Sequence, residues 1–264
     1  MELSKRLRKV AELVLPVDVL ADVGCDHGYL SIYLAEKQRC RHVIAMDINK
    51  GPLEKARENI RKFGFADYIE TRLSDGLNKL EAGEAEGCVC AGMGGPLALQ
   101  ILWNDRYKVK DMKQIVLQTQ SELWLVRRTL RQWGFVIEKE EIEYEDGKYY
   151  FMMRIVPGEN LNMDNLPGEE AVFFDELPYA RGDEDSVIPE EWLESRCYEL
   201  FAKELLCQGN TLLKDYIGKE IKRLTDVYKT LHLQEDSEKC RERMKTVEKE
   251  LAIHQWALEH YEVK

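Results

Sequence analysis

Short apolar runs alternate with amphipathic stretches over the first half of the chain. The runs are typical of buried strands, and the stretches between them place apolar residues at helical spacing. Strands separated by single helices favour a parallel sheet with right-handed crossovers. The expected strands are 19–23, 42–47, 68–72, 87–91 and 115–117, and the expected helices are 4–15, 28–37, 53–62, one starting near Pro96, and 122–133.

Two further strands, 135–144 and 148–156, flank the tight turn Glu145-Asp146-Gly147. This spacing predicts an antiparallel hairpin at one edge of the sheet. The first half of the chain is therefore expected to form an α/β fold on a seven-stranded, mostly parallel sheet.

The pattern changes after residue 156. Residues 157–191 hold four of the seven prolines, eleven acidic residues and a single base, Arg181, which indicates a linker or an irregular excursion. Helical periodicity then continues to the end, with helices expected at 190–207, 213–231 and 240–261. We expect three parts: an α/β domain at 1–156, an acidic linker at 157–191 and a helical domain at 192–264.

The last two helices predict an antiparallel hairpin of coiled-coil type, because a short link joins them and the second carries a heptad pattern. His254 lies within this pattern and is expected to be a packed residue rather than a ligand. The heptad positions are Cys240, Met244, Val247, Leu251, His254, Leu258 and Tyr261.

The formal net charge of −11 arises almost wholly from the acidic segment 157–191, and the remainder of the chain is nearly balanced. A balanced protein can still present a basic face, so the charge does not exclude a nucleic-acid partner. No apolar run is long enough to cross a membrane, and the first residues lack an apolar signal core, so we expect a cytoplasmic protein. The seven scattered cysteines indicate reduced, space-filling thiols and no metal site. Separately, we favour a monomer.

A glycine-bearing turn follows the first expected strand, in the run Asp22-Val23-Gly24-Cys25-Asp26-His27-Gly28. Because glycine has no side chain, a ligand can approach the backbone there. Asp47 ends the next strand, about 20 residues on, where a carboxylate can accept hydrogen bonds from both hydroxyls of a ribose. The pattern predicts a nucleotide-shaped ligand.

The loop favours S-adenosyl-L-methionine (SAM) over a dinucleotide. The dinucleotide fingerprint is Gly-x-Gly-x-x-Gly, whereas this loop reads Gly24-x-Asp26-x-Gly28. An acidic side chain at a helix N-terminus repels a pyrophosphate. SAM has no phosphate, and its ammonium and sulfonium groups are cationic, so Asp22 and Asp26 suit it.

A second glycine run, Ala91-Gly92-Met93-Gly94-Gly95, ends the fourth expected strand. Ligands of open parallel sheets bind beyond the carboxyl ends of the strands, so this run is expected to border the same crevice and to let a methyl acceptor approach the backbone. Asp75, after the third strand, is placed to accept a hydrogen bond from an adenine amino group, although Asp-Gly is also a common turn pair.

The titratable groups expected nearest the methyl donor are Asp26 and His27, either of which can orient the acceptor or take a proton. His27 can alternatively bond to backbone at the start of the helix. The run Gln118-Thr119-Gln120-Ser121 offers neutral hydrogen-bonding groups on the acceptor side, and Ser121 can alternatively cap the following helix.

These motifs, with Leu3-Ser4-Lys5-Arg6-Leu7 and Glu145-Asp146-Gly147-Lys148-Tyr149-Tyr150, resemble the bacterial tRNA adenine-N1 methyltransferases of the TrmK type, which modify adenine 22. The resemblance covers residues 1–156 well and the C-terminal helices more loosely. It implies a Rossmann-like class I SAM-dependent methyltransferase fold. The chain departs from the usual Gln-Pro-Asn pattern of that family at Gln118-Thr119-Gln120.

The resemblance and the residue patterns together give three sets of candidates. The expected cofactor-binding residues are Asp22, Gly24, Asp26, Gly28, Asp47, Ile48, Asp75, Gly76, Ala91, Gly92 and Met93. The expected residues beside the reacting atoms are Asp26, His27, Met93 and Gly94. The basic residues expected to hold tRNA phosphates, or else to be solvated helix faces, are Lys5, Arg6, Arg8, Lys9, Arg127, Arg128 and Arg131.

Two other functions remain open at this point. A SAM-dependent methyltransferase acting on a protein or a small molecule would use the same cofactor residues without needing the basic faces. A non-catalytic SAM-binding module would use its helical hairpin to recruit a partner protein. A NAD-linked oxidoreductase is disfavoured by Asp26.

Overall fold

The computed structural model describes residues 1–166, 188–234 and 237–261. The chain divides into two compact units, Met1–Glu169 and Glu170–Lys264. No helix among the described residues is long and apolar enough to cross a membrane.

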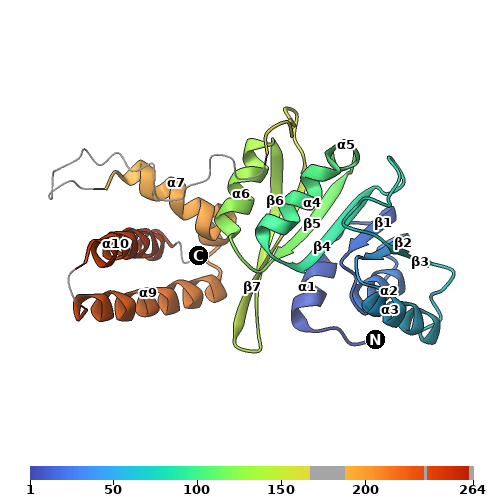
Figure 1. Cartoon of the computed structure of the whole chain (residues 1–264), viewed down its shortest axis with the longest axis horizontal. Coiled ribbons are helices and arrows are strands. Elements are labelled where there is room, and N and C mark those ends of the chain that lie inside the picture. Colours follow the sequence, from blue (N-terminus) through green and yellow to red (C-terminus); the bar gives the residue numbers. More distant parts are fainter. Residues whose placement is uncertain (167–187, 235–236, 262–264) are drawn as a thin grey trace. The chain divides into compact units, whose positions relative to one another are not determined.

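The first unit is built on one seven-stranded sheet with the order β3-β2-β1-β4-β5-β7-β6 (Figure 1). Strands β1 to β5 are parallel, and β7 runs antiparallel to both β5 and β6. The seven-stranded, mostly parallel sheet predicted from the sequence is therefore confirmed. The strands are β1 (Val17–Val23), β2 (Cys40–Asp47), β3 (Ile69–Leu73), β4 (Gly87–Met93), β5 (Gln114–Thr119), β6 (Phe135–Glu145) and β7 (Lys148–Pro157).

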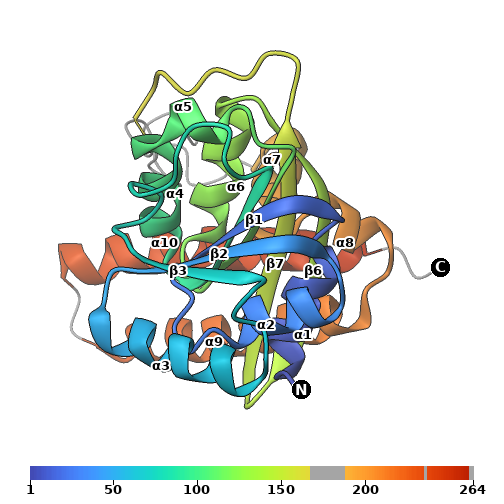
Figure 2. The same ribbon diagram turned by 90° about the vertical axis from the view of Figure 1, so that its right-hand side faces the viewer.

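Helices cover both faces of this sheet, which explains why its central strands are almost continuously apolar. In Figure 2, α1, α2 and α3 lie on one face and α4, α5 and α6 on the other. Alternate residues of β4 accordingly enter different cores: Cys88 and Cys90 pack towards α4 and α6, and Val89 packs towards α1 to α3. The helices are α1 (Lys5–Leu13), α2 (Tyr29–Glu36), α3 (Lys50–Lys62), α4 (Gly95–Asn104), α5 (Arg106–Val109) and α6 (Leu123–Gln132).

The β6–β7 hairpin is long, and its turn extends beyond the neighbouring strands beside α1 (Figure 1). The carboxylate of Glu145, at this turn, accepts the backbone N–H of Lys5 at 2.6 Å and that of Arg6 at 3.4 Å. The Ser4 hydroxyl caps the same helix by accepting the Leu7 N–H at 3.2 Å. The hairpin turn thus fixes the first turn of α1.

The start of the expected linker packs on the first unit instead of leaving it. The N–H of Asn162 donates to the Trp133 carbonyl at 2.7 Å, the Trp133 indole donates to the Asn165 carbonyl at 3.0 Å, and the Met163 side chain is buried. Residues 167–187, which make up most of the expected acidic linker, lie outside the described residues.

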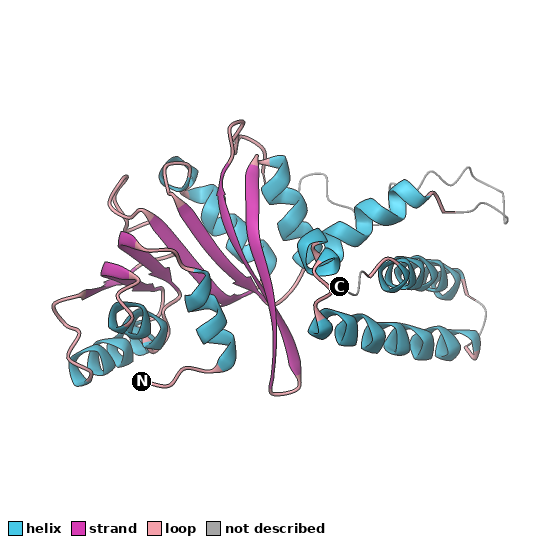
Figure 3. Ribbon diagram, turned by 180° about the vertical axis from the view of Figure 1, so that it is seen from behind, coloured by secondary structure: helices cyan, strands magenta, loops and turns pink. Residues whose placement is uncertain are grey.

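The second unit is helical, with α7 (Glu190–Phe201), α8 (Lys203–Cys207), α9 (Thr211–His232) and α10 (Glu238–Glu259) (Figure 3). The single helix expected at 190–207 is wrong, because Ala202 has φ +62° and divides it into two helices. Helices α9 and α10 pack against each other, as the pattern predicted.

One position of the predicted heptad is also wrong. Leu258 is exposed, and Ile253 and Ala257 are buried in its place, because the buried stripe drifts around α10 at the ordinary helical period. His254 is a packed residue, as expected. Its Nδ1 lies 2.7 Å from the Glu250 carbonyl, and its ring meets Phe201 edge to face.

Close contact between β4 and β5 leaves no room for a side chain at Gly87. A Cβ there would lie 2.7 Å from the Gln114 carbonyl oxygen. We expect Gly87→Ala to lower the free energy of unfolding by about 1–3 kcal/mol, because Gln114 is itself held by two hydrogen bonds to the Leu15 backbone. Urea unfolding measures this change. Gly51→Ala, at the start of α3 with nothing within 4 Å, is the control and should not destabilise the protein; equal losses in both variants would contradict the packing argument.

Candidate functional site

The carboxyl ends of β1, β2, β3 and β4 bring the two glycine loops and all four predicted carboxylates to one edge of the sheet. The β1–α2 loop is tied to β2, because the N–H groups of Gly24 and Cys25 both donate to the Met46 carbonyl, at 2.8 and 2.9 Å. Gly24 and Gly28 have φ of +74° and +73°, a conformation that glycine adopts without strain. A Cβ on Gly28 would also lie 3.1 Å from the Ala56 Cβ, so this turn needs glycine for space as well.

Asp47 lies at the centre of this edge. Its carboxylate accepts the N–H of Asp26 at 3.1 Å and that of Asn49 at 2.8 Å, and its backbone carbonyl accepts the Ser74 N–H at 2.9 Å. Three loops therefore meet at one residue. The neighbouring Ile48 side chain is 59% exposed, which leaves an apolar surface beside the carboxylate.

Asp22 is buried beneath the β1–α2 loop and accepts a hydrogen bond of 2.5 Å from the Ser31 hydroxyl. Burial raises the pKa of Asp22 to about 6. This carboxylate holds the first turn of α2 in place.

The β4 loop is shaped by a bulge. The pairing of β4 with β5 shifts between Ala91 and Met93, and Gly92, at the bulge, has φ +87°. Met93 reaches the first glycine loop, because a Cβ on Gly24 would lie 3.5 Å from the Met93 Cε. The two glycine runs predicted from the sequence thus lie next to each other at this edge, as expected.

Ser121 supports this loop rather than capping its own helix. Its hydroxyl accepts the Gly95 N–H at 3.4 Å, and a Cβ on Gly94 would lie 3.2 Å from the same oxygen. The residue before α6 is Glu122, which makes no side-chain capping bond. The alternative role of Ser121 as an N-cap is therefore wrong.

The titratable candidates are exposed to solvent at the same edge. The Asp26 and His27 side chains are exposed, with 3.6 Å between Asp26 Oδ1 and His27 Nε2. Asp75 is exposed in the loop after β3, and Gly76 packs next to Ile101 of α4. No group of three or more metal-ligating side chains occurs among the described residues.

Several exposed apolar side chains at this edge were not predicted from the sequence. Tyr29 begins α2 and is 40% exposed, and Leu97, in the first turn of α4, is 54% exposed. Both lie in helices that are apolar on most sides, where the sequence pattern gives no means of telling an outward apolar residue from a core residue. Exposed apolar groups around a crevice suit a planar base.

The predicted basic residues differ in their surroundings. The Arg127 prediction is wrong, because its side chain is buried and its Nε donates to both carboxylate oxygens of Glu140, at 2.9 and 3.2 Å. Lys9 lies 3.8 Å from the Glu141 carboxylate, and Arg128 lies over the Trp124 ring. Lys5, Arg8 and Arg131 are exposed, and Arg6 is half-buried.

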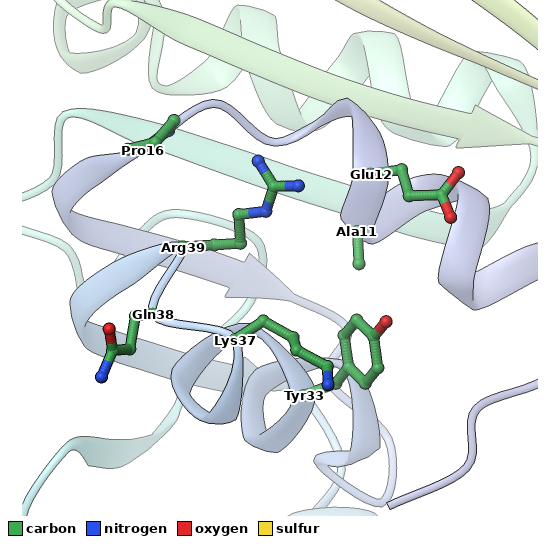
Figure 4. A pocket seen from close by; sticks show the side chains of 7 residues that line it. All are labelled: Ala11, Glu12, Pro16, Tyr33, Lys37, Gln38 and Arg39. Carbon is green, nitrogen blue, oxygen red and sulfur yellow. The ribbon is translucent and has the colours of Figure 1, made fainter.

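Two grooves lie at the opposite edge of the sheet. The first, of about 410 Å³, is bordered by α1, α2 and the residues before β1 and β2, among them Pro16, Tyr33 and Arg39 (Figure 4). The second, of about 440 Å³, lies between α5 and residues 161–164. Ligands of parallel sheets bind at the carboxyl ends of the strands, so neither groove is the predicted site.

The residues at the carboxyl edge fit a ligand of the SAM type. Two loops leave backbone uncovered, one carboxylate is fixed at the end of β2, and apolar surface lies beside it. Asp26 precedes the N-terminus of α2, where a pyrophosphate would need a positive environment.

All seven cysteines are unpaired thiols, six of them buried, and burial raises the pKa of Cys25.

A protein-family model described as a methyltransferase domain matches residues 3–153, more than half of the 264 residues. The chain belongs to this methyltransferase-domain family. The matched range of the methyltransferase domain contains both glycine loops, Asp47 and most of the β6–β7 hairpin.

One related sequence and two solved structures resemble this chain. The tRNA (adenine(22)-N(1))-methyltransferase of Bacillus subtilis (strain 168) is 35% identical over 150 residues, which cover 57% of this chain and 63% of that protein, just under two thirds of its length. The crystal structure of the B. subtilis m1A22 tRNA methyltransferase TrmK superposes with a TM-score of 0.77 at 25% identity, over 97% of this chain and 99% of that one. A Streptococcus pneumoniae protein solved in complex with SAM has the same fold, with a TM-score of 0.76 at 24% identity over 97% of this chain and all of that one.

The buried Asp22 carboxyl predicts a pH dependence of stability. Its pKa is raised from 3.8 to about 6 on folding, so its contribution to stability is fully present below pH 4 and is lost as the pH rises through 6. We therefore expect the free energy of unfolding of Asp22→Asn, relative to that of the native protein, to rise by up to about 3 kcal/mol between pH 4 and 7. Urea unfolding of both proteins across this range measures the difference, and a difference that stays constant with pH would contradict it.

Because Arg127 is paired with Glu140 in the core, we expect its substitution to lower the stability of the protein rather than to weaken RNA binding directly. Arg127→Met leaves the Glu140 carboxylate buried without its main partner, so we expect a loss of about 3–5 kcal/mol in the free energy of unfolding. The double variant Arg127→Met with Glu140→Leu should recover much of this loss. A double variant no more stable than the single one would show that the pair is not the cause.

Proposed function

We propose that this chain is a SAM-dependent methyltransferase that transfers a methyl group to N1 of an adenine in tRNA, at position 22. The observation that carries the proposal is the 35% sequence identity with the B. subtilis adenine-22 enzyme over 150 residues. The carboxyl edge of the sheet supports it, because its loops and carboxylates suit a cationic, phosphate-free cofactor.

Asp47 is the residue we assign to the ribose. Each of its carboxylate oxygens already accepts one backbone N–H, and each keeps a lone pair for a hydroxyl group. The exposed Ile48 offers an apolar face to the adenine of the cofactor, and Asp75 offers an acceptor for its amino group. When bound, SAM supplies an electrophilic methyl group on a sulfonium.

The acceptor chemistry requires alignment more than activation. Adenine N1 carries a lone pair at neutral pH, so no general base is needed to make it a nucleophile. N1 lies on the Watson–Crick edge, so the base has to leave its pair or its stack. The exposed apolar side chains of Tyr29 and Leu97 provide a surface against which such a base can pack and from which water is excluded.

Positive charge develops on the adenine ring as N1 is methylated. Asp26 is an exposed carboxylate in the loop before α2, and His27 lies beside it. We assign Asp26 to the exocyclic amino group, where a hydrogen-bond acceptor becomes more favourable as the ring gains charge. Met93 and Gly94 border the reacting atoms without a titratable group.

A tRNA substrate implies a cytoplasmic protein, and the reaction needs no metal ion. We propose that the helical unit is a separate domain that follows the acidic segment, and that the enzyme acts as a monomer.

The test is methyl transfer from labelled SAM to unmodified bacterial tRNA, followed by nucleoside analysis. We expect labelled 1-methyladenosine, and a tRNA with guanosine at position 22 should take no label. Asp47→Ala should weaken SAM binding by about tenfold or more, because it removes an acceptor and releases two loops. SAM binding without any label in tRNA would instead favour a protein or small-molecule acceptor.

A further inference from the structure

Arg6 is a half-buried cation at the carboxyl edge of the sheet that has no acidic partner. Its Nη1 donates a hydrogen bond of 2.5 Å to the amide oxygen of Gln118, and its guanidinium lies 5.4 Å from the centre of the Tyr150 ring. Among the described residues, no carboxylate lies within 4 Å of its guanidinium. Both of its partners are neutral.

Acidic partners are plentiful in this protein, which has 49 acidic and 38 basic residues. Three other partly buried arginines of the first unit do have acidic partners: Arg72 binds Glu70 and Glu84, Arg127 binds Glu140, and Arg154 binds Glu138. Arg39, at the opposite edge, instead donates to the Val14 carbonyl at 3.5 Å. A guanidinium has five N–H donors, and the structure uses one of them at Arg6. The remaining donors are available to an anion that is not part of the chain.

Three separate contacts fix the position of Arg6. Glu145 and Ser4 hold the first turn of α1, Gln118 holds the guanidinium at the end of β5, and the Tyr150 ring of β7 lies against it. A Cβ on Gly92 would lie only 3.7 Å from the Nη1 of Arg6, so the bulge in β4 brings the backbone of the β4 loop next to this arginine.

The sheet order places Arg6 on the acceptor side. Its contacts lie on β5 and β7, and β4 separates these strands from β1 and β2, whose loops carry Gly24 and Asp47. An anion bound by Arg6 would therefore lie beside the β4 loop. The predicted ribose site lies on the other side of that loop.

We propose that Arg6 binds a phosphate of the nucleotide that is methylated and so fixes the position of its base at the β4 loop. This inference rests on the proposed tRNA substrate. A planar guanidinium binds two phosphate oxygens at once, and a backbone contact fixes the register of a base without reading it. Gln118 then acts as a positioning residue, because it orients the guanidinium.

The first experiment compares Arg6→Lys and Arg6→Gln with the native enzyme. We expect kcat/KM for tRNA to fall about 10- to 100-fold in both variants, because a lysine ammonium does not reproduce the two-oxygen contact. The dissociation constant for SAM, measured by calorimetry, should stay unchanged. Arg41→Lys, an exposed arginine in β2 at the opposite edge, is the matched control and should keep the native kcat/KM.

The second experiment removes the charge from the substrate. Synthetic stem-loops carry one methylphosphonate, 5′ or 3′ of the target adenine. At one of these positions the native enzyme should lose activity about as strongly as Arg6→Gln loses it on the unmodified substrate. Arg6→Gln should lose little more there, because the contact is already absent.

Each contrary outcome identifies what fails. A weaker affinity for SAM in the variants would assign Arg6 to the cofactor carboxylate and overturn the inference. Native activity that is insensitive to both methylphosphonates would also overturn it, even where an Arg6 variant folds poorly. A native enzyme that methylates no tRNA overturns the proposed function and this inference together, whereas normal tRNA methylation by the Arg6 variants overturns this inference alone.

Discussion

Two successive residues at the end of β2 hold the β1–α2 loop in its shape. The Met46 carbonyl accepts two backbone N–H groups of this loop, and the Asp47 carboxylate accepts a third. A glycine turn without such partners would leave buried donors unsatisfied and would have no fixed conformation. The crevice at the carboxyl edge therefore depends on strand pairing, because the register of β1 on β2 decides which carbonyl meets which N–H.

The sequence predicted the parts of the fold that follow from local pattern. The strands, the glycine loops and Asp47 could be found because period, glycine and strand ends are local signals, and a parallel sheet brings its carboxyl ends together. The short helix α5 and the break at Ala202 were missed, since neither interrupts an apolar period in a recognisable way.

Side-chain partners between distant segments could not be predicted. Arg127 and Arg131 are spaced one helical turn apart and look alike in sequence, yet the first is buried against Glu140 and the second is exposed. The two share one face of α6, so the helical period does not separate them. Only Arg127 meets Glu140 of β6, and no local pattern gives that pairing. The same holds for Arg6, whose neutral partners come from β5 and β7, more than 110 residues away.

The bond between Glu145 and the start of α1 also bears on how the domain is assembled. Its partners are 140 residues apart, so it closes nearly the whole domain into one loop. During synthesis, α1 leaves the ribosome first but cannot gain this contact until the β6–β7 hairpin has been made. The cofactor half of the crevice, built from β1 to β4, can form earlier. The acceptor side closes last, so a chain truncated before the hairpin would keep the ribose site and lose the wall that faces the substrate.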